Sequence, residues 1–145
     1  MATVRDLLAK KGNRVWTTTQ EASVLDAARL MNEHKIGALV VMAGAEVVGI
    51  FSERDVLRRV VVERRDPVIT PVADVMTREV FCGTMETSID EARNTMKIRR
   101  IRHLPVVDDQ NRLLGLISIG DLNAHDIADH EQTIHIMHEY LYGRV

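Results

Sequence analysis

Cysteine is almost absent from the sequence, since Cys82 is the only one in 145 residues. A single cysteine excludes an intramolecular disulfide and suits a reducing compartment, and we expect it to face the core. No apolar run approaches the roughly 20 residues that a membrane-spanning helix needs. Residues 1–11 carry charges where the apolar centre of a secretory signal would lie. We therefore expect a cytoplasmic protein with no membrane partner.

An excess of positive charge is also missing. The chain has 19 Lys and Arg residues against 21 Asp and Glu residues, for a formal net charge of −2. Proteins that bind nucleic acid usually carry a basic excess, so nucleic acid is not expected as an obligatory partner. A composition of 46% hydrophobic and 28% charged residues is typical of a globular protein.

An internal repeat dominates what is present. Residues 49–55 and 115–121 both read Gly, two apolar residues, Ser, two variable residues and Asp. Amphipathic helix patterns precede them at 23–33 and 88–97, and each motif ends a predicted hairpin and begins a second helix. Each copy is thus predicted as β-α-β-β-α. The boundaries are 1–66 for the first repeat, 67–71 for a linker that contains Pro67 and Pro71, and 72–145 for the second repeat with an extended C-terminal helix.

The Ser and Asp of the repeated motif allow two interpretations. Ser52 and Ser118 lie where a helix N-cap belongs, and Asp55 and Asp121 follow three residues later, which is the pattern of a capping box that needs no ligand. The same positions also place a positive helix end and free N–H groups beside a carboxylate. That combination suits a ligand with an anionic part and a diol part.

The repeat resembles the cystathionine-β-synthase (CBS) domain, of which a tandem pair forms a Bateman module. The resemblance rests on the two closing motifs, the helix-then-hairpin order, the opening Val-x-Asp phrases at Val4 and Val72, and Leu104-Pro105-Val106. It implies an α/β (α+β) fold with two repeats packed pseudo-symmetrically. It also implies clefts between the repeats that bind AMP, ATP, NAD or S-adenosylmethionine. The expected protein is a non-catalytic regulatory homodimer that acts on an unidentified partner protein in trans, with no metal.

The resemblance also implies roles for individual residues. Asp55 and Asp121 would accept hydrogen bonds from ribose hydroxyls, which suits an acceptor-only carboxylate, and Ser52 and Ser118 would contact ribose or phosphate. The expected phosphate ligands are Arg54, Arg102 and His103, although a solvated charged face explains these residues as well. The expected adenine wall consists of Thr18, Thr19, Ile36, Gly37, Ala38, Ile101 and Leu104, although β-propensity alone also explains the two threonines.

The two copies differ in their charges. Arg54 lies beside Asp55, whereas Gly120 occupies the equivalent place in the second copy. This difference indicates that the clefts prefer different phosphate lengths or that one is empty. The Arg58-Arg59 pair is expected to be solvated.

Other functions remain open. One is an interaction module for protein or nucleic acid with vestigial clefts, and another is a small nucleotide-processing enzyme that uses Asp55 or Asp121. The C-terminal histidines suggest a metal site, but His130 and His135 are spaced one residue too far apart for the zinc-protease helix motif. The same helix carries an apolar stripe suited to a partner.

Overall fold

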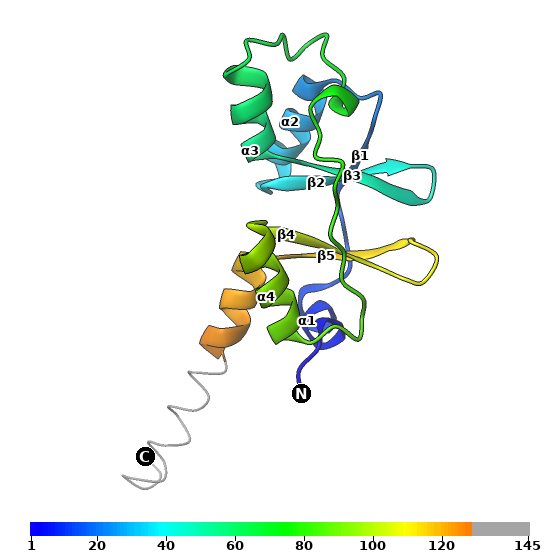
Figure 1. Cartoon of the computed structure of the whole chain (residues 1–145), viewed down its shortest axis with the longest axis vertical. Helices are drawn as coiled ribbons and strands as arrows, with labels where there is room; N and C mark the ends of the chain where they lie inside the picture. The colour runs from blue at the N-terminus through cyan, green and yellow to red at the C-terminus, as the bar shows by residue number, and fades with distance from the viewer. Residues whose placement is uncertain (129–145) are drawn as a thin grey trace, which may run out of the picture.

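The computed structural model describes residues 1–128 and shows a mixed α+β fold in which two small sheets stack on each other (Figure 1). One sheet has the order β1-β2-β3 and the other is the hairpin β4-β5. The predicted pair of repeats, each with a helix before a hairpin, is confirmed. Residues 119–128 are helical, and the predicted continuation of this helix, with its histidines from 130 onward and most of its apolar stripe, lies outside the described residues.

The first repeat follows the predicted order β-α-β-β-α, preceded by one helix that was not predicted. Strand β1 runs parallel to β2, and β2 runs antiparallel to β3 with a bulge between Val41 and Met42. The second helix begins as α3 and continues directly as a π-helix. The elements are α1 (Val4–Lys11), β1 (Thr17–Thr19), α2 (Val24–His34), β2 (Ala38–Ala43), β3 (Glu46–Ser52), α3 (Glu53–Asp55) and η1 (Val56–Val61).

The second repeat lacks the first predicted strand. A single parallel bridge between Gly83 and Val106 takes its place. Three consecutive threonines favour a strand in β1, whereas glycine disfavours one at the equivalent position. The elements are the 3₁₀ helix η2 (Val72–Asp74), α4 (Ile89–Arg99), β4 (His103–Val107) and β5 (Leu113–Ser118).

Helices α2 and α4 are built in the same way. The hydroxyls of Ser23 and Ser88 accept hydrogen bonds from backbone N–H groups three residues later, each at 3.0 Å. Both helices end at a left-handed residue, Lys35 with φ of 53° and Arg100 with φ of 55°. Their predicted apolar faces are buried, which confirms the helix periodicity.

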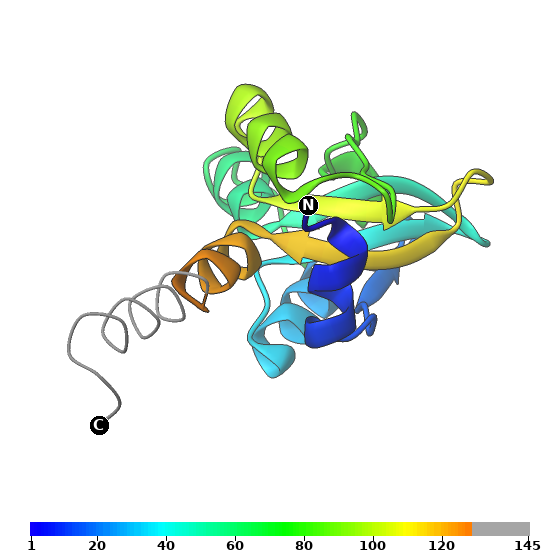
Figure 2. The ribbon, with the colours of Figure 1, turned by 90° about the horizontal axis from the view of Figure 1, so that it is seen from below.

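The opening segment of each repeat packs into the core of the other repeat. Helix α1 lies beside α4 and below the β4-β5 hairpin (Figures 1 and 2), while residues 72–76 pack into the core formed by α2 and β2. Backbone bridges from Thr3 to Ser88 and from Ser23 to Pro71 fix the exchange. Neither repeat therefore completes its core alone. The second core contains Val4, Leu7, Leu8, Ile89, Ala92, Met96, Leu104, Val106, Ile117 and Leu122.

The opening segments that pack into the other repeat's core, together with the residues that directly follow them, are called here the crossing segments. The glycines of the repeated motif make room for them. A Cβ atom on Gly49 would lie 2.7 Å from Sδ of Met76 and 3.0 Å from the carbonyl oxygen of Thr77. A Cβ atom on Gly115 would lie 2.8 Å from a methyl carbon of Leu8. The glycine in each motif is thus explained by close packing against the other repeat's opening segment.

Replacing Gly49 by Ala should lower the free energy of unfolding by about 1–3 kcal/mol, because an added methyl group overpacks a buried contact. Urea denaturation measures the change. Gly120→Ala is the matched control, since its Cβ would meet only the Ser118 hydroxyl at 3.5 Å and alanine favours a helix. Equal stability of Gly49→Ala and the unmodified chain would contradict the close packing of Met76 and Thr77 against Gly49.

Candidate functional site

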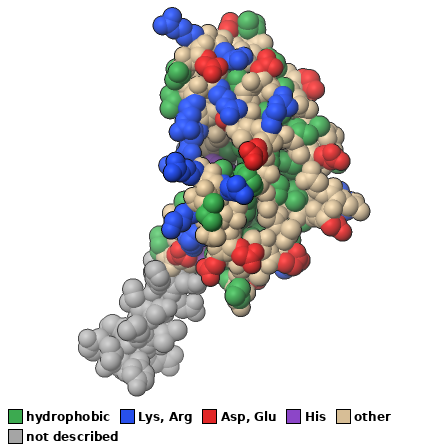
Figure 3. Space-filling view, in the orientation of Figure 1, with side chains coloured by type: hydrophobic (Ala, Val, Ile, Leu, Met, Phe, Trp, Pro, Cys, Tyr) green, Lys and Arg blue, Asp and Glu red, His purple; other side chains and the backbone are tan. Residues whose placement is uncertain are grey.

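Two cavities lie between the repeats. The first has a volume of about 930 Å³ and is called here the Asp55 cleft; the second has about 380 Å³ and is called the Asp121 cleft. Three segments line each cavity. They are the repeated motif of one repeat, the residues around the start of the hairpin in the other repeat, and part of a crossing segment. The space-filling view shows Lys and Arg side chains along one side of a hollow between the two halves (Figure 3).

The structure brings most of the predicted site residues together across the repeats. Ile101, Arg102 and His103 of the second repeat join Ser52, Arg54 and Asp55 of the first in the Asp55 cleft. Ile36, Gly37 and Ala38 join Ser118 and Asp121 in the Asp121 cleft. Gly37, His103 and Ser118 line both cavities.

Three predicted wall residues line neither cavity. Thr18 and Thr19 lie in β1, paired with Val41 and Met42. Leu104 is 1% exposed and belongs to the second core. Successive strand residues point to opposite faces, so His103 reaches the clefts and Leu104 does not.

The capping-box interpretation is confirmed at both motifs. The Ser52 hydroxyl accepts from the Asp55 N–H at 3.3 Å, and the Asp55 carboxylate accepts from the Ser52 N–H at 3.0 Å. Ser118 and Asp121 repeat the pair at 3.1 and 2.8 Å. The N–H of Glu53 also donates to the carbonyl of Gly37. The expectation of free N–H groups at these helix ends is therefore wrong for the N–H groups of Glu53 and Asp55.

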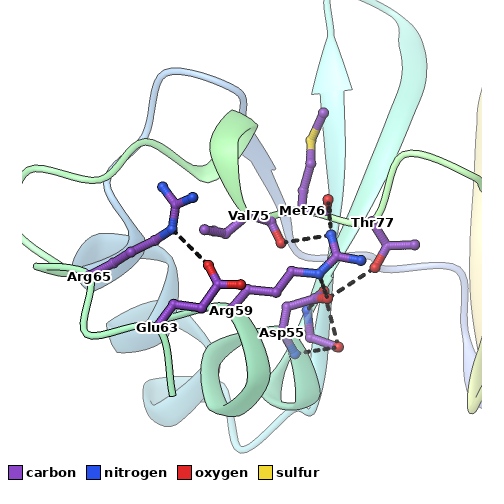
Figure 4. Close-up of polar contacts among 8 residues, drawn as sticks. Asp55, Arg59, Glu63, Arg65, Val75, Met76 and Thr77 are labelled. Carbon is purple, nitrogen blue, oxygen red and sulfur yellow. Dashed lines mark hydrogen bonds and ion pairs between the residues drawn. The ribbon is translucent and has the colours of Figure 1, made fainter. Parts of the chain in front are cut away.

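Asp55 lines the cleft and also contacts Thr77 of the crossing segment (Figure 4). Its side chain is buried, and Oδ1 accepts from the Thr77 hydroxyl at 3.0 Å and lies 3.8 Å from Nε of Arg59. Arg59 also donates to the carbonyl of Met76 at 2.8 Å. The expectation that Arg59 is merely solvated is wrong, because this guanidinium forms an ion pair with the Asp55 carboxylate and donates a hydrogen bond to the backbone of Met76.

Asp121 has a different partner. The ammonium of Lys11 donates to Oδ2 of Asp121 at 2.6 Å and to the carbonyl of Leu116 at 2.6 Å. The equivalent carboxylates therefore differ, since one meets a neutral hydroxyl and an arginine while the other meets a lysine.

Cations and apolar groups surround Asp55 in a manner that suits a phosphorylated nucleoside. Val80, Phe81 and Ile101 give the cleft an apolar part, and the guanidinium of Arg99 lies 4.4 Å from the Phe81 ring centre. The guanidinium of Arg54 donates to the carbonyl of Arg100 at 3.3 Å, which directs it across the cleft to the other repeat. The arginines that line the cleft are Arg54, Arg58, Arg59, Arg100 and Arg102.

Sequence reasoning missed the crossing segments as parts of the site. Thr77, Val80 and Phe81 line the Asp55 cleft, and Lys11 and Trp16 line the Asp121 cleft. The repeat offered a signal, because Trp16 lies 65 positions before Phe81 just as Ser23 lies 65 positions before Ser88.

His103 lies at the centre, where both clefts meet. Burial is the main cause that lowers its pKa below the ordinary histidine value, and the positive charges of Lys11, Arg102 and Arg54 act in the same direction. The Asp121 carboxylate opposes them. An anion bound between the repeats would offset these positive charges and favour protonated His103.

The remaining expectations for residues 1–128 concern metal ligands, membrane-spanning helices and the single cysteine. In this part of the chain no group of three His, Cys, Asp or Glu side chains could hold a metal ion. No helix there is long and apolar enough to cross a membrane. Cys82 is exposed, so the expectation that it faces the core is wrong.

Comparison with known proteins identifies the repeats. The sequence model of the CBS domain matches residues 4–62 and 72–126. The CBS domain-containing protein CBSX3 of Arabidopsis thaliana, named as mitochondrial, is 35% identical over 97% of this chain and 72% of its own length. The compartment of the present chain stays a prediction.

Solved structures agree with this match. A protein with CBS domains from Burkholderia ambifaria has a TM-score of 0.84 and 42% identity, over 88% of this chain and 96% of that one. The CBS domain pair of protein MJ0100, solved in complex with 5′-methylthioadenosine and S-adenosyl-L-methionine, has a TM-score of 0.80 at 22% identity, over 89% and 98%. At that identity the likeness shows the shared fold.

The lowered pKa of His103 should make the chain less stable in mild acid. Since the folded chain holds this proton less tightly than the unfolded chain, the free energy of unfolding should fall as pH decreases from the ordinary histidine pKa of about 6.5 toward the folded value. Urea midpoints at about pH 7.5 and 5.5 measure the fall, which should be smaller in His103→Gln. An equal fall in both proteins would contradict the assignment.

Proposed function

The chain belongs to the CBS domain family, and we propose that it binds an adenosyl ligand between its two repeats as a non-catalytic regulatory module. The observation that carries the proposal is a buried carboxylate, Asp55, in a cleft that is lined by both arginines and apolar residues. A ribose diol, a phosphate and an adenine ring need these three kinds of surface.

The chemistry of each part supports a nucleotide. An ionised carboxylate accepts hydrogen bonds and cannot donate them, so Asp55 suits a diol and repels a phosphate. The Thr77 hydroxyl can rotate away from Oδ1 and leave that oxygen to a ribose hydroxyl. The planar guanidinium groups of Arg54 and Arg102 match phosphate oxygens. The apolar side chain of Ile101 can contact the adenine base.

The proposed ligands are AMP, ATP, NAD or S-adenosylmethionine. The complex of MJ0100 with 5′-methylthioadenosine and S-adenosyl-L-methionine is a precedent for the adenosyl class in this fold. The arginine side of the Asp55 cleft favours members that carry phosphate, because S-adenosylmethionine brings a sulfonium cation to the same surface.

Regulation requires more than tight binding. A ligand shifts an equilibrium only if it binds two conformations or assembly states with different affinity. We propose that the chain works as a homodimer in the cytoplasm and passes the change to a partner protein in trans.

AMP should raise the denaturation midpoint of the chain, and Asp55→Asn should weaken AMP binding about tenfold or more. The loss corresponds to a charge-assisted hydrogen bond of ~1.5–3 kcal/mol. Calorimetric titration measures the affinity. The matched control is Asp109→Asn, which neutralises an exposed carboxylate in the turn between β4 and β5.

Two outcomes would contradict the proposal. If AMP, ATP, NAD and S-adenosylmethionine all leave the midpoint unchanged at millimolar concentration, the clefts are vestigial and an interaction module is favoured. If ATP is consumed during prolonged incubation with magnesium, and Asp55→Asn stops the loss, the protein is an enzyme.

A further inference from the structure

Lys11 takes over two bonds that Thr77 makes in the other half of the molecule. Thr77 donates its N–H to the carbonyl of Ile50 at 2.8 Å and its hydroxyl to Asp55 at 3.0 Å. The residues 66 positions along from Ile50 and Asp55 are Leu116 and Asp121. The single ammonium of Lys11 donates to both, each at 2.6 Å.

The ammonium therefore lies against the carboxylate that a ribose diol would use in the Asp121 cleft, on Oδ2, which also accepts from the Ser118 N–H. We propose that Lys11 closes this cleft to adenosyl ligands, so that each chain holds one ligand, in the Asp55 cleft. The inference rests on the proposed function, and it names Lys11 as the residue that sets the number of sites.

Displacing Lys11 is harder than displacing the Thr77 hydroxyl. When that hydroxyl turns away, the backbone of Thr77 stays bonded to Ile50 in both directions, at 2.8 and 2.9 Å. When Lys11 leaves, two hydrogen bonds from a charged donor are lost together, and such bonds are stronger than those of a neutral hydroxyl. The carboxylate of Asp121 then also loses its positive partner.

The Asp121 cleft is also the smaller of the two. Its volume is about 380 Å³, against about 930 Å³ for the Asp55 cleft. Trp16 stacks on His34 with ring centres 3.5 Å apart, and the guanidinium of Arg14 lies 5.1 Å from the Trp16 ring centre. The Trp16 indole, which lines this cleft, is thus already in contact with two protein groups.

Exchanging the two residues that contact the Asp55 and Asp121 carboxylates tests the inference directly. Lys11→Thr gives the Asp121 cleft the residue of the Asp55 cleft, and Thr77→Lys does the reverse. Lys10→Thr is the control, because Lys10 is an exposed neighbour in α1 that lines neither cleft. Urea midpoints establish that each variant is folded before ligand is added.

The number of ligands per chain is counted by calorimetry and native mass spectrometry with AMP, ATP, NAD and S-adenosylmethionine as separate probes. Trp16 is the only tryptophan in the chain and lines the Asp121 cleft, so its fluorescence reports occupancy of that cleft.

The unmodified chain and Lys10→Thr should bind one equivalent without a change in Trp16 fluorescence. Lys11→Thr should bind two equivalents, and the second should change the fluorescence. Thr77→Lys should bind at least tenfold more weakly than the unmodified chain.

Several results would overturn the inference while leaving the proposed function intact. These are two equivalents on the unmodified chain, a change in its Trp16 fluorescence on binding, or a single equivalent on Lys11→Thr. Failure of all four probes to bind either protein would overturn the proposed function and the inference with it.

Discussion

The exchange of opening segments between the repeats is the constraint on which the rest of the molecule depends. Helix α1 completes the second core and residues 72–76 complete the first, so the two sheets are held against each other. Each crossing ends at the floor of a cleft, where Thr77 bonds Asp55 and Lys11 bonds Asp121. The contacts that hold the fold together are therefore neighbours of the contacts that we assign to the ligand.

Local features could be predicted from the sequence because they depend on nearby residues. Helices α2 and α4 lie where the apolar periodicity places them, and both hairpins lie where apolar runs and turns place them. The exchange could not be predicted, because a repeat shows which segments are equivalent but not which copy each one packs against. That is why Lys11 and Thr77 were missed. Leu104 was misplaced as a wall residue for another reason: strand alternation turns it into the core.

The two clefts share a backbone plan and differ in charge. The contrast between Arg54 and Gly120 indicates this in the sequence, and the structure adds the larger contrast between Thr77 and Lys11. A ligand that takes Oδ1 of Asp55 from Thr77 would release one bond of the crossing segment, whose Val75 and Met76 lie in the first core. Binding at Asp55 thus has a physical route to the packing between the repeats, which a regulatory module needs.

A crystal structure of the chain with AMP tests the central claim most directly. We expect the ribose hydroxyls on the Asp55 carboxylate, the phosphate against Arg54 and Arg102, and the contact between Lys11 and Asp121 unchanged. AMP bound at Asp121 with Lys11 displaced, or bound anywhere other than between the repeats, would contradict it.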